Sequence, residues 1–156
     1  MRELSKKEVK QVRQALEAVL GQKLGISSLY EHVQGELIYY TQEPAKQVVA
    51  VAVHGAIFPA LNLFWKLKIR PKTSYVVVDQ GAVKPIVSGA DILRPGIIEV
   101  HNIEKQKLCA VLEPERRVPI AVGLCLVSEE ELKNMQRGKC IKNLHHLGDR
   151  LWKLDF

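Results

Sequence analysis

The chain is 156 residues long, with 47% hydrophobic and 26% charged side chains and a formal net charge of +6. This is the composition of an ordinary globular protein, and it excludes a disordered or collagen-like chain. The length allows one domain or two small ones, and the positive charge permits nucleic-acid binding without establishing it.

The first part of the chain predicts a helix followed by short strands. Ser5 and Glu8 form a capping-box pattern, apolar residues then recur at helical spacing, and Gly21 ends the run. The cations on the other face of this helix are expected to be solvated. Apolar runs and turn residues predict the next elements: strands over 35–40 and 47–53, and a helix over 57–66 with Pro59 in its first turn.

A basic segment over 66–72 follows, and Pro71 interrupts its pattern. If this linker is extended, its four alternating cations share one side, where they either contact phosphates or form a solvated surface. These residues are Lys66, Lys68, Arg70 and Lys72. We therefore predict an N-terminal α/β domain over 1–72 and a second domain over 73–156.

The second domain is predicted to be a small β-barrel. Short apolar runs follow one another without the dozen residues that a parallel crossover needs. The strands are expected at 75–78, 83–87, 97–100, 108–112, 120–127, 139–142 and 151–154. A turn over 79–82, a short helical turn over 88–96, a polar hairpin loop at 114–117, and a helix that Ser128 and Glu131 cap and Gly138 ends complete the domain.

Catalytic and metal sites find little support in the residues. Nucleophile-elbow and phosphate-loop motifs do not occur, and His54 has no visible catalytic partner. His145 and His146 are adjacent, so in a strand they point to opposite faces and cannot easily share one ion. We expect no catalytic residue, no metal and no cofactor.

Three cysteines without a C-x-x-C pair predict buried, reduced thiols: Cys109, Cys125 and Cys140. No apolar run approaches the length that spans a bilayer, and the first residues lack the apolar stretch of a signal peptide. The expected location is therefore the cytoplasm, without a membrane partner.

Four stretches of the sequence resemble a known family. Residues 79–84 (DQGAVK) and 88–97 (SGADILRPGI) resemble the opening of a PUA domain, the small RNA-binding pseudo-barrel of pseudouridine synthases and archaeosine transglycosylases. The ending at 138–152 (GKCIKNLHHLGDRLW) is similar to the malignant T-cell amplified sequence and translation-machinery-associated family, and 57–64 resembles its helix before the barrel. The short linker and the short hairpin at 113–118 resemble an archaeal-type member.

This resemblance implies an α+β fold, with a pre-PUA domain followed by a PUA barrel, and a non-catalytic protein of the translation apparatus. The implied ligand is structured RNA, either tRNA or rRNA. The implied partners are the small ribosomal subunit and a protein with an initiation-factor-like domain, in initiation, reinitiation or ribosome recycling. Two alternatives stay open: an accessory subunit for RNA modification or ribosome biogenesis, and an adaptor that docks on a ribosomal protein.

The family's RNA-binding surface can be carried over residue by residue. It comprises Lys84, Ser88, Gly89, Ala90, Asp91, Arg94, Lys139, Lys142, Arg150 and Lys153. Charge, rather than the resemblance, adds the four linker cations as an auxiliary surface. Charge alone also singles out 137–153, which holds five cations and one anion. We expect backbone N–H groups at a helix start over 88–91, flanked by Lys139 and Arg150, to form one phosphate cradle.

Overall fold

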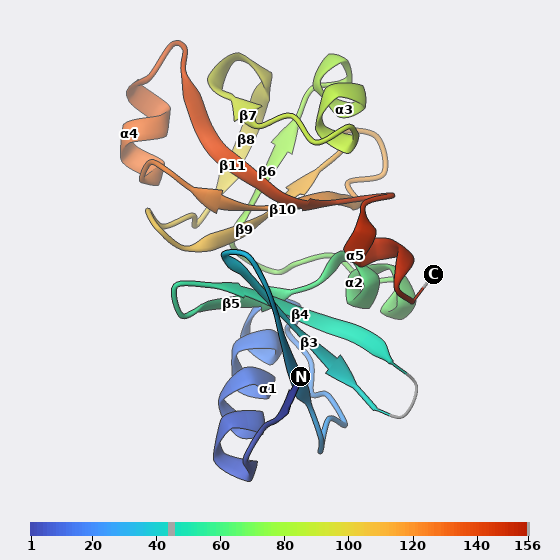
Figure 1. The fold of residues 1–156 in the computed structure, drawn as a ribbon. Coiled ribbons are helices and arrows are strands. Elements are labelled where there is room, and N and C mark those ends of the chain that lie inside the picture. Colours follow the sequence, from blue (N-terminus) through green and yellow to red (C-terminus); the bar gives the residue numbers. More distant parts are fainter. Residues whose placement is uncertain (44–45, 156) are drawn as a thin grey trace.

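The computed structural model describes residues 1–43 and 46–155, and it shows two sheets stacked against each other (Figure 1). One sheet is antiparallel throughout, with strand order β1–β2–β3–β4–β5. The other is curled into a half-barrel, with strand order β7–β11–β10–β9–β6–β8. The predicted α+β fold class is confirmed.

The first sheet carries helix α1 on the face away from the half-barrel (Figure 1). Its elements are β1 (Arg2–Glu3), α1 (Lys6–Leu20), β2 (Tyr30–Gln34), β3 (Leu37–Gln42), β4 (Gln47–Val53) and β5 (Ala56–Pro59). The predicted capping box is confirmed, since the Glu8 N–H donates to the Ser5 hydroxyl at 3.2 Å and the Glu8 carboxylate accepts from the Ser5 N–H at 2.9 Å. Gly21 ends the helix at φ 72°.

Two predictions in this region need correction. The strand expected over 35–40 begins at Leu37, because Gly35 adopts φ 62° in the turn that joins β2 to β3. The helix expected over 57–66 begins only at Leu61, and helix α2 is Leu61–Leu67. The residues before it form β5, because the turn at His54 and Gly55 folds them back onto β4, and Pro59 ends that strand.

The half-barrel contains six strands and four short helical elements in the described residues. They are β6 (Tyr75–Val78), α3 (Gln80–Val87), β7 (Ile92–Leu93), the 3₁₀ helix η1 (Arg94–Gly96), β8 (Ile97–His101), β9 (Leu108–Leu112), β10 (Pro119–Cys125), α4 (Glu129–Asn134), β11 (Lys139–His146) and α5 (Arg150–Lys153). The edge strands β7 and β8 are separated along the chain only by η1, so the two edges of the sheet must lie close together. This short connection explains the curl.

Five predictions in the half-barrel were wrong. The short helical turn over 88–96 is helical only in η1, and Ile92–Leu93 within it form β7. The turn over 79–82 and the strand over 83–87 are helix α3, because Asp79 caps it: the Ala82 N–H donates to the Asp79 carboxylate at 3.0 Å. The strand over 151–154 is helix α5, which Asp149 caps through the Trp152 N–H at 2.8 Å. Helix α4 has the predicted capping box, but it ends before Met135 rather than at Gly138.

Strands β6, β9 and β10 separate two hydrophobic cores. Along β9, Leu108, Ala110 and Leu112 pack toward the first sheet, whereas Cys109 and Val111 pack inside the half-barrel. All five residues are buried, so β9 reads as a continuous apolar run rather than an alternating one. The first core is shared by both sheets, and it fixes one sheet against the other.

The C-terminal segment ties the half-barrel to the first sheet. His145 Nδ1 donates to the Asp149 carboxylate at 2.9 Å, and its Nε2 accepts the Leu61 N–H of α2 at 3.2 Å. Further on, the Asp155 carboxylate accepts the Val48 N–H at 2.7 Å and forms an ion pair with Lys66. These bonds place α5, and the cations it carries, at the junction of the two sheets (Figure 1).

Asp149 makes this tie sensitive to acid. Burial raises the pKa of its carboxyl, but hydrogen bonds from His145 and from the N–H groups of Trp152 and His146 outweigh burial, so the net pKa is lowered. A lowered pKa adds stability above the unfolded-state value of about 3.9, and this stability is lost as the pH falls through the folded-state value.

We therefore expect Asp149→Asn to destabilise the protein at neutral pH and to have a much smaller effect in strong acid. The measurement is the free energy of unfolding by urea for both proteins, from neutral pH down to about two units below the unfolded-state pKa. The difference between the two proteins should shrink as the pH falls. A difference that is constant over the whole range would show that the charge of Asp149 contributes nothing.

Candidate nucleic-acid interface

The surface loop 88–91 follows α3 and lies along β11, where Asn143 holds it. Asn143 Nδ2 donates to the carbonyls of Ile86 at 3.0 Å and Ala90 at 2.9 Å, and its backbone N–H donates to the Asp91 carboxylate at 2.8 Å. Residues 88–90 are nevertheless exposed. The loop is therefore accessible to a ligand and fixed by two hydrogen bonds from Asn143, which also bonds to the end of α3. Sequence reasoning did not single out Asn143.

The predicted helix start at 88–91 is wrong, and the phosphate cradle goes with it. This loop follows the C-terminal end of α3, and its N–H groups are already used: Ser88 N donates to Pro85 O at 3.1 Å, Gly89 N to Ile86 O at 3.0 Å, and Ala90 N to Pro85 O at 3.0 Å. The C-terminal end of a helix also carries partial negative charge. The amides of residues 88–90 are therefore not free to form the predicted anion cradle.

Gly89 still has a conformational reason to be glycine. Its φ is 101°, which side chains rarely adopt, and an added Cβ would lie 3.5 Å from His146 Nε2. The Ser88 hydroxyl donates to the Lys84 carbonyl at 3.0 Å and so closes the last turn of α3. Ser88 and Gly89 therefore let the loop pack closely against β11.

The predicted cations of the half-barrel differ in what they contact. Lys139 Nζ lies 2.8 Å from Asp91 Oδ2, and this bond is the main reason that the pKa of Asp91 is lowered. Lys142 Nζ lies 3.5 Å from the Glu36 carboxylate of the first sheet. Within the described residues, Lys84, Arg150 and Lys153 form no ion pair and are exposed.

Arg94 has a positioning role in the structure. Its Nε donates to the Leu132 carbonyl at 2.7 Å and its Nη1 to the Ile97 carbonyl at 3.0 Å, so the side chain ties η1 to α4. Asp91 likewise uses its carboxylate on Asn143 and Lys139. Contact of either residue with RNA remains a prediction.

These cations form a row rather than one cradle. Lys139 begins β11 and His146 ends it, and seven steps of about 3.3 Å separate them by roughly 23 Å. Arg150 lies beyond that end, on α5. Lys139 and Arg150 therefore cannot hold the same phosphate, but they can contact different phosphates of one extended ligand.

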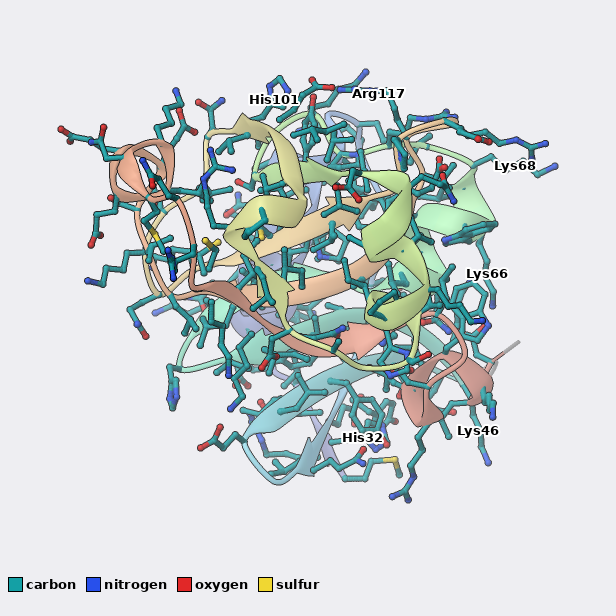
Figure 2. All side chains as sticks on the ribbon, turned by 90° about the horizontal axis from the view of Figure 1, so that it is seen from above. His32, Lys46, Lys66, Lys68, His101 and Arg117 are labelled. Atoms are coloured by element: carbon teal, nitrogen blue, oxygen red, sulfur yellow. The ribbon has the colours of Figure 1, made fainter. Side chains whose placement is uncertain are left out.

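The sequence predicted that the four linker cations share one side if the linker is extended. That condition is not met, because the segment begins inside a helix. Lys66 lies on α2 and pairs with Asp155, and Lys68 ends that helix at φ 56° (Figure 2). The Arg70 guanidinium donates to the Arg116 carbonyl through Nε at 2.8 Å and Nη2 at 2.6 Å. The Lys72 side chain packs over Gly21 instead.

A groove of about 340 Å³ lies between α2 and the β9–β10 turn. We call it the α2 groove, and it was not predicted from the sequence. Its floor is apolar and its rim is basic: the lining residues are Phe64, Trp65, Ile69, Val118 and Pro119, with Lys68, Arg70 and Arg116 at the rim. On α2, Leu61 and Phe64 are buried in the core, whereas Trp65 is 38% exposed.

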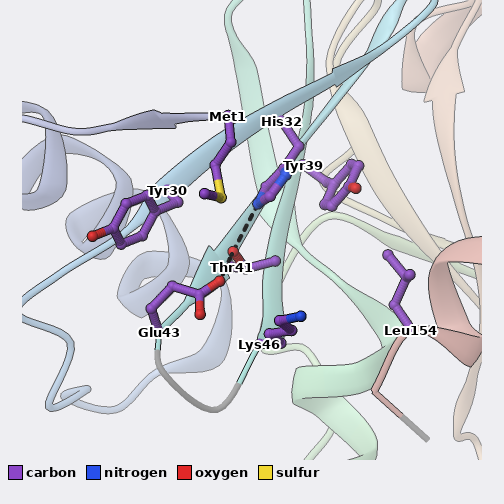
Figure 3. Close-up of a pocket in the computed structure, with 8 residues that line it drawn as sticks. All are labelled: Met1, Tyr30, His32, Tyr39, Thr41, Glu43, Lys46 and Leu154. Carbon is purple, nitrogen blue, oxygen red and sulfur yellow. Dashed lines mark hydrogen bonds between the residues drawn. The ribbon is translucent and has the colours of Figure 1, made fainter.

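A second pocket, of about 440 Å³, opens on the first sheet between β2, β3 and the end of α5 (Figure 3). The rings of His32 and Tyr39 stack at 4.6 Å and are nearly parallel, and His32 Nε2 lies 2.8 Å from Thr41 Oγ1. Burial lowers the pKa of His32, which favours its neutral ring. The alternation of Tyr30 with His32 and of Tyr39 with Thr41 is the sequence signal that could have indicated this face.

The expected buried thiols are confirmed, since Cys109, Cys125 and Cys140 are free and buried. The described residues contain no cluster of three or more side chains that could hold a metal ion. None of the helices in the described ranges combines the length and apolarity needed to cross a membrane.

A model of the PUA domain matches residues 74–147. An uncharacterized protein of Methanocaldococcus jannaschii is 35% identical over 96% of this chain and 93% of its own length. Translation machinery-associated protein 20 of Schizosaccharomyces pombe is 38% identical over 64% of this chain, and the match spans just over half, 56%, of that relative.

Malignant T-cell-amplified sequence 1 of Rattus norvegicus is 27% identical over 80% of this chain and 67% of its own length. Among solved structures, a hypothetical protein of Pyrococcus horikoshii superimposes with a TM-score of 0.79 over 99% of both chains, at 26% identity. The whole two-sheet arrangement is therefore shared with a solved archaeal structure.

Proposed function

This chain belongs to the family of PUA-domain proteins, and we propose that it is a non-catalytic RNA-binding protein of the translation apparatus. Its ligand is structured RNA, tRNA or rRNA. The name of the Schizosaccharomyces pombe relative, translation machinery-associated protein 20, supports a place in the translation machinery. We place it in the cytoplasm, on the small ribosomal subunit, together with a partner that carries an initiation-factor-like domain, in initiation or ribosome recycling.

The observation that carries this proposal is the exposed loop 88–91, held on β11 and flanked by cations that have no carboxylate partner among the described residues. Lys84 precedes the loop on α3, and Arg150 and Lys153 follow β11 on α5. Each would neutralise a backbone phosphate, which provides affinity without sequence preference.

Other residues would refine the contact. Ser88 and Gly89 leave space for a ribose 2′-hydroxyl to approach the loop, which is how a protein distinguishes RNA from DNA. Lys139 and Lys142 would exchange their carboxylate partners for phosphates. Asp91 and Arg94 would hold the loop and η1 in place.

The test is a charge reversal at Lys84 and Arg150, because neither side chain has a structural partner in the described residues. We expect the Lys84→Glu, Arg150→Glu double variant to bind unfractionated tRNA and a small-subunit rRNA fragment about tenfold more weakly at low salt. The slope of log affinity against log salt should fall by roughly two, about one for each lost phosphate contact. Fluorescence anisotropy over a salt series measures both quantities.

Lys10→Glu is the matched control, since Lys10 is exposed on α1 and its side chain forms no hydrogen bond or ion pair with the described residues. It changes the net charge in the same direction at a distant surface, so it should leave the salt slope unchanged. If Lys10→Glu and the double variant weaken binding equally for each charge changed, net charge rather than this surface determines the affinity. Lys139→Glu is a poorer test, because the new carboxylate would face Asp91.

The two alternatives give different results. Turnover in a tRNA modification assay with this protein alone would contradict the non-catalytic proposal, whereas turnover that needs a second, catalytic chain would favour the accessory subunit. Ribosomal proteins that remain bound after nuclease treatment would favour an adaptor. RNA-dependent recovery of the same partners would support direct RNA binding.

A further inference from the structure

We propose that the α2 groove binds an unpaired nucleotide of single-stranded RNA, with the base on the apolar floor and its phosphate at the basic rim. The groove lies beside α2 and the β9–β10 turn, not on the loop 88–91 surface. The proposal rests on the RNA-binding function above for its choice of nucleic acid over other anions. Three observations support it: the apolar floor of the groove, its basic rim, and the hydrogen bonds that hold Trp65 and Arg70 in place.

The floor presents an aromatic ring that is already fixed. Trp65 Nε1 donates to the Pro119 carbonyl at 2.9 Å, and the ring packs edge-on against Trp152 with centroids 5.8 Å apart. The side chain is still 38% exposed and lines the groove. Unpaired bases stack on aromatic side chains of this kind, and a ring held in place loses little conformational entropy on binding.

The rim presents one guanidinium, that of Arg70, whose position is also fixed. Arg70 uses two of its five N–H donors on the Arg116 carbonyl, which leaves three donors for a ligand. The turn that carries this carbonyl is held by Glu113, whose carboxylate accepts the N–H groups of Glu115 at 3.0 Å and Arg116 at 2.6 Å. The negative charge of Glu113 is thus directed into the turn.

The charge of the groove is complementary to an anion. Lys68, Arg70 and Arg116 line it, and no carboxylate does among the residues that the structure describes. A guanidinium binds carboxylate and phosphate equally well, but the exposed indole beside it offers a stacking surface for the planar base of a nucleotide, which an acidic side chain lacks. We therefore commit to RNA as the occupant.

Tryptophan fluorescence reports directly on this groove, because the chain has two tryptophans. In Trp152→Phe, Trp65 is the sole reporter. We expect a single-stranded oligoadenylate of about six nucleotides to quench its emission, and the corresponding duplex to quench far less. Wild-type protein, titrated in parallel, shows whether the substitution itself disturbs binding.

Arg116→Ala tests the rim without breaking the contact to Arg70, which uses the backbone carbonyl of residue 116. We expect it to weaken the quenching affinity about fivefold, roughly the loss of one phosphate contact. Arg117→Ala is the matched control. Arg117 belongs to the same turn but pairs with Glu99 and lies beside His101, and it does not line the groove (Figure 2).

The outcomes separate this inference from the function proposed above. Quenching that survives Lys84→Glu, Arg150→Glu and weakens in Arg116→Ala supports a distinct nucleotide site. Absence of quenching while tRNA still binds overturns the groove site and leaves the RNA-binding function standing. Equal quenching by polyglutamate overturns RNA as the occupant and indicates an acidic protein segment instead.

Discussion

Replacement of His145 by alanine is expected to lower the free energy of unfolding by about 3 kcal/mol. His145 is fully buried, and it bonds to Asp149 on one side and to the Leu61 N–H on the other. Alanine would leave a cavity, an unpaired N–H at the start of α2, and a carboxylate that loses one donor. Each of these defects is costly in a buried position.

His146→Ala is the control for this prediction. Its Nδ1 donates only to the adjacent Leu147 carbonyl, and the side chain is partly exposed, so we expect a loss below about 1 kcal/mol. Urea unfolding of both variants gives the two free energies. Equal losses would show that the hydrogen bond between His145 of β11 and the Leu61 N–H of α2 contributes no more than a local surface contact.

The two histidines show which features of the structure the local sequence can predict and which it cannot. Strand alternation predicts that neighbouring side chains point to opposite faces, and the structure places His145 in the core and His146 partly at the surface. No sequence rule predicts that His145 accepts an N–H from a residue 84 positions earlier. The reason is that this contact depends on how the two sheets pack.

Elements with their own local signals were predicted well. The capping boxes at Ser5 and Ser128, and the β-branched run over 47–53, specify a helix start or a strand within a few residues. The failures are short apolar runs, such as 83–87 and 151–154, whose length fits either a strand or a helix turn. There, an aspartate cap decides the outcome, and its side chain lies just outside the run.

The candidate surface was predicted only in part, for an electrostatic reason. Composition finds clusters of cations, but it does not show which cations already have carboxylate partners. Lys139 pairs with Asp91, Lys142 with Glu36 and Lys66 with Asp155, and each partner is distant in sequence. The succession of short apolar runs indicated the barrel, and the resemblance supplied the family. The α2 groove required the packing of the β9–β10 turn against α2.

Gly123→Ala is expected to be among the most destabilising single substitutions in the half-barrel, with a loss of about 3 kcal/mol. Gly123 lies at a register shift between β10 and β11, and an added Cβ would clash with Ile141 Cγ2 and lie 2.6 Å from the Lys142 carbonyl oxygen. The second contact is to backbone, so rotation of a side chain cannot relieve it. The strands would have to move apart.

Gly25→Ala is the matched control, because a Cβ there meets nothing within 4 Å and its φ is not in the left-handed region. We expect a change within about 0.5 kcal/mol, measured by the same urea unfolding. A loss at Gly123 no larger than at Gly25 would mean that β10 and β11 separate freely. In that case Asn143, which β11 carries, could not hold the loop 88–91 as the proposed RNA surface requires.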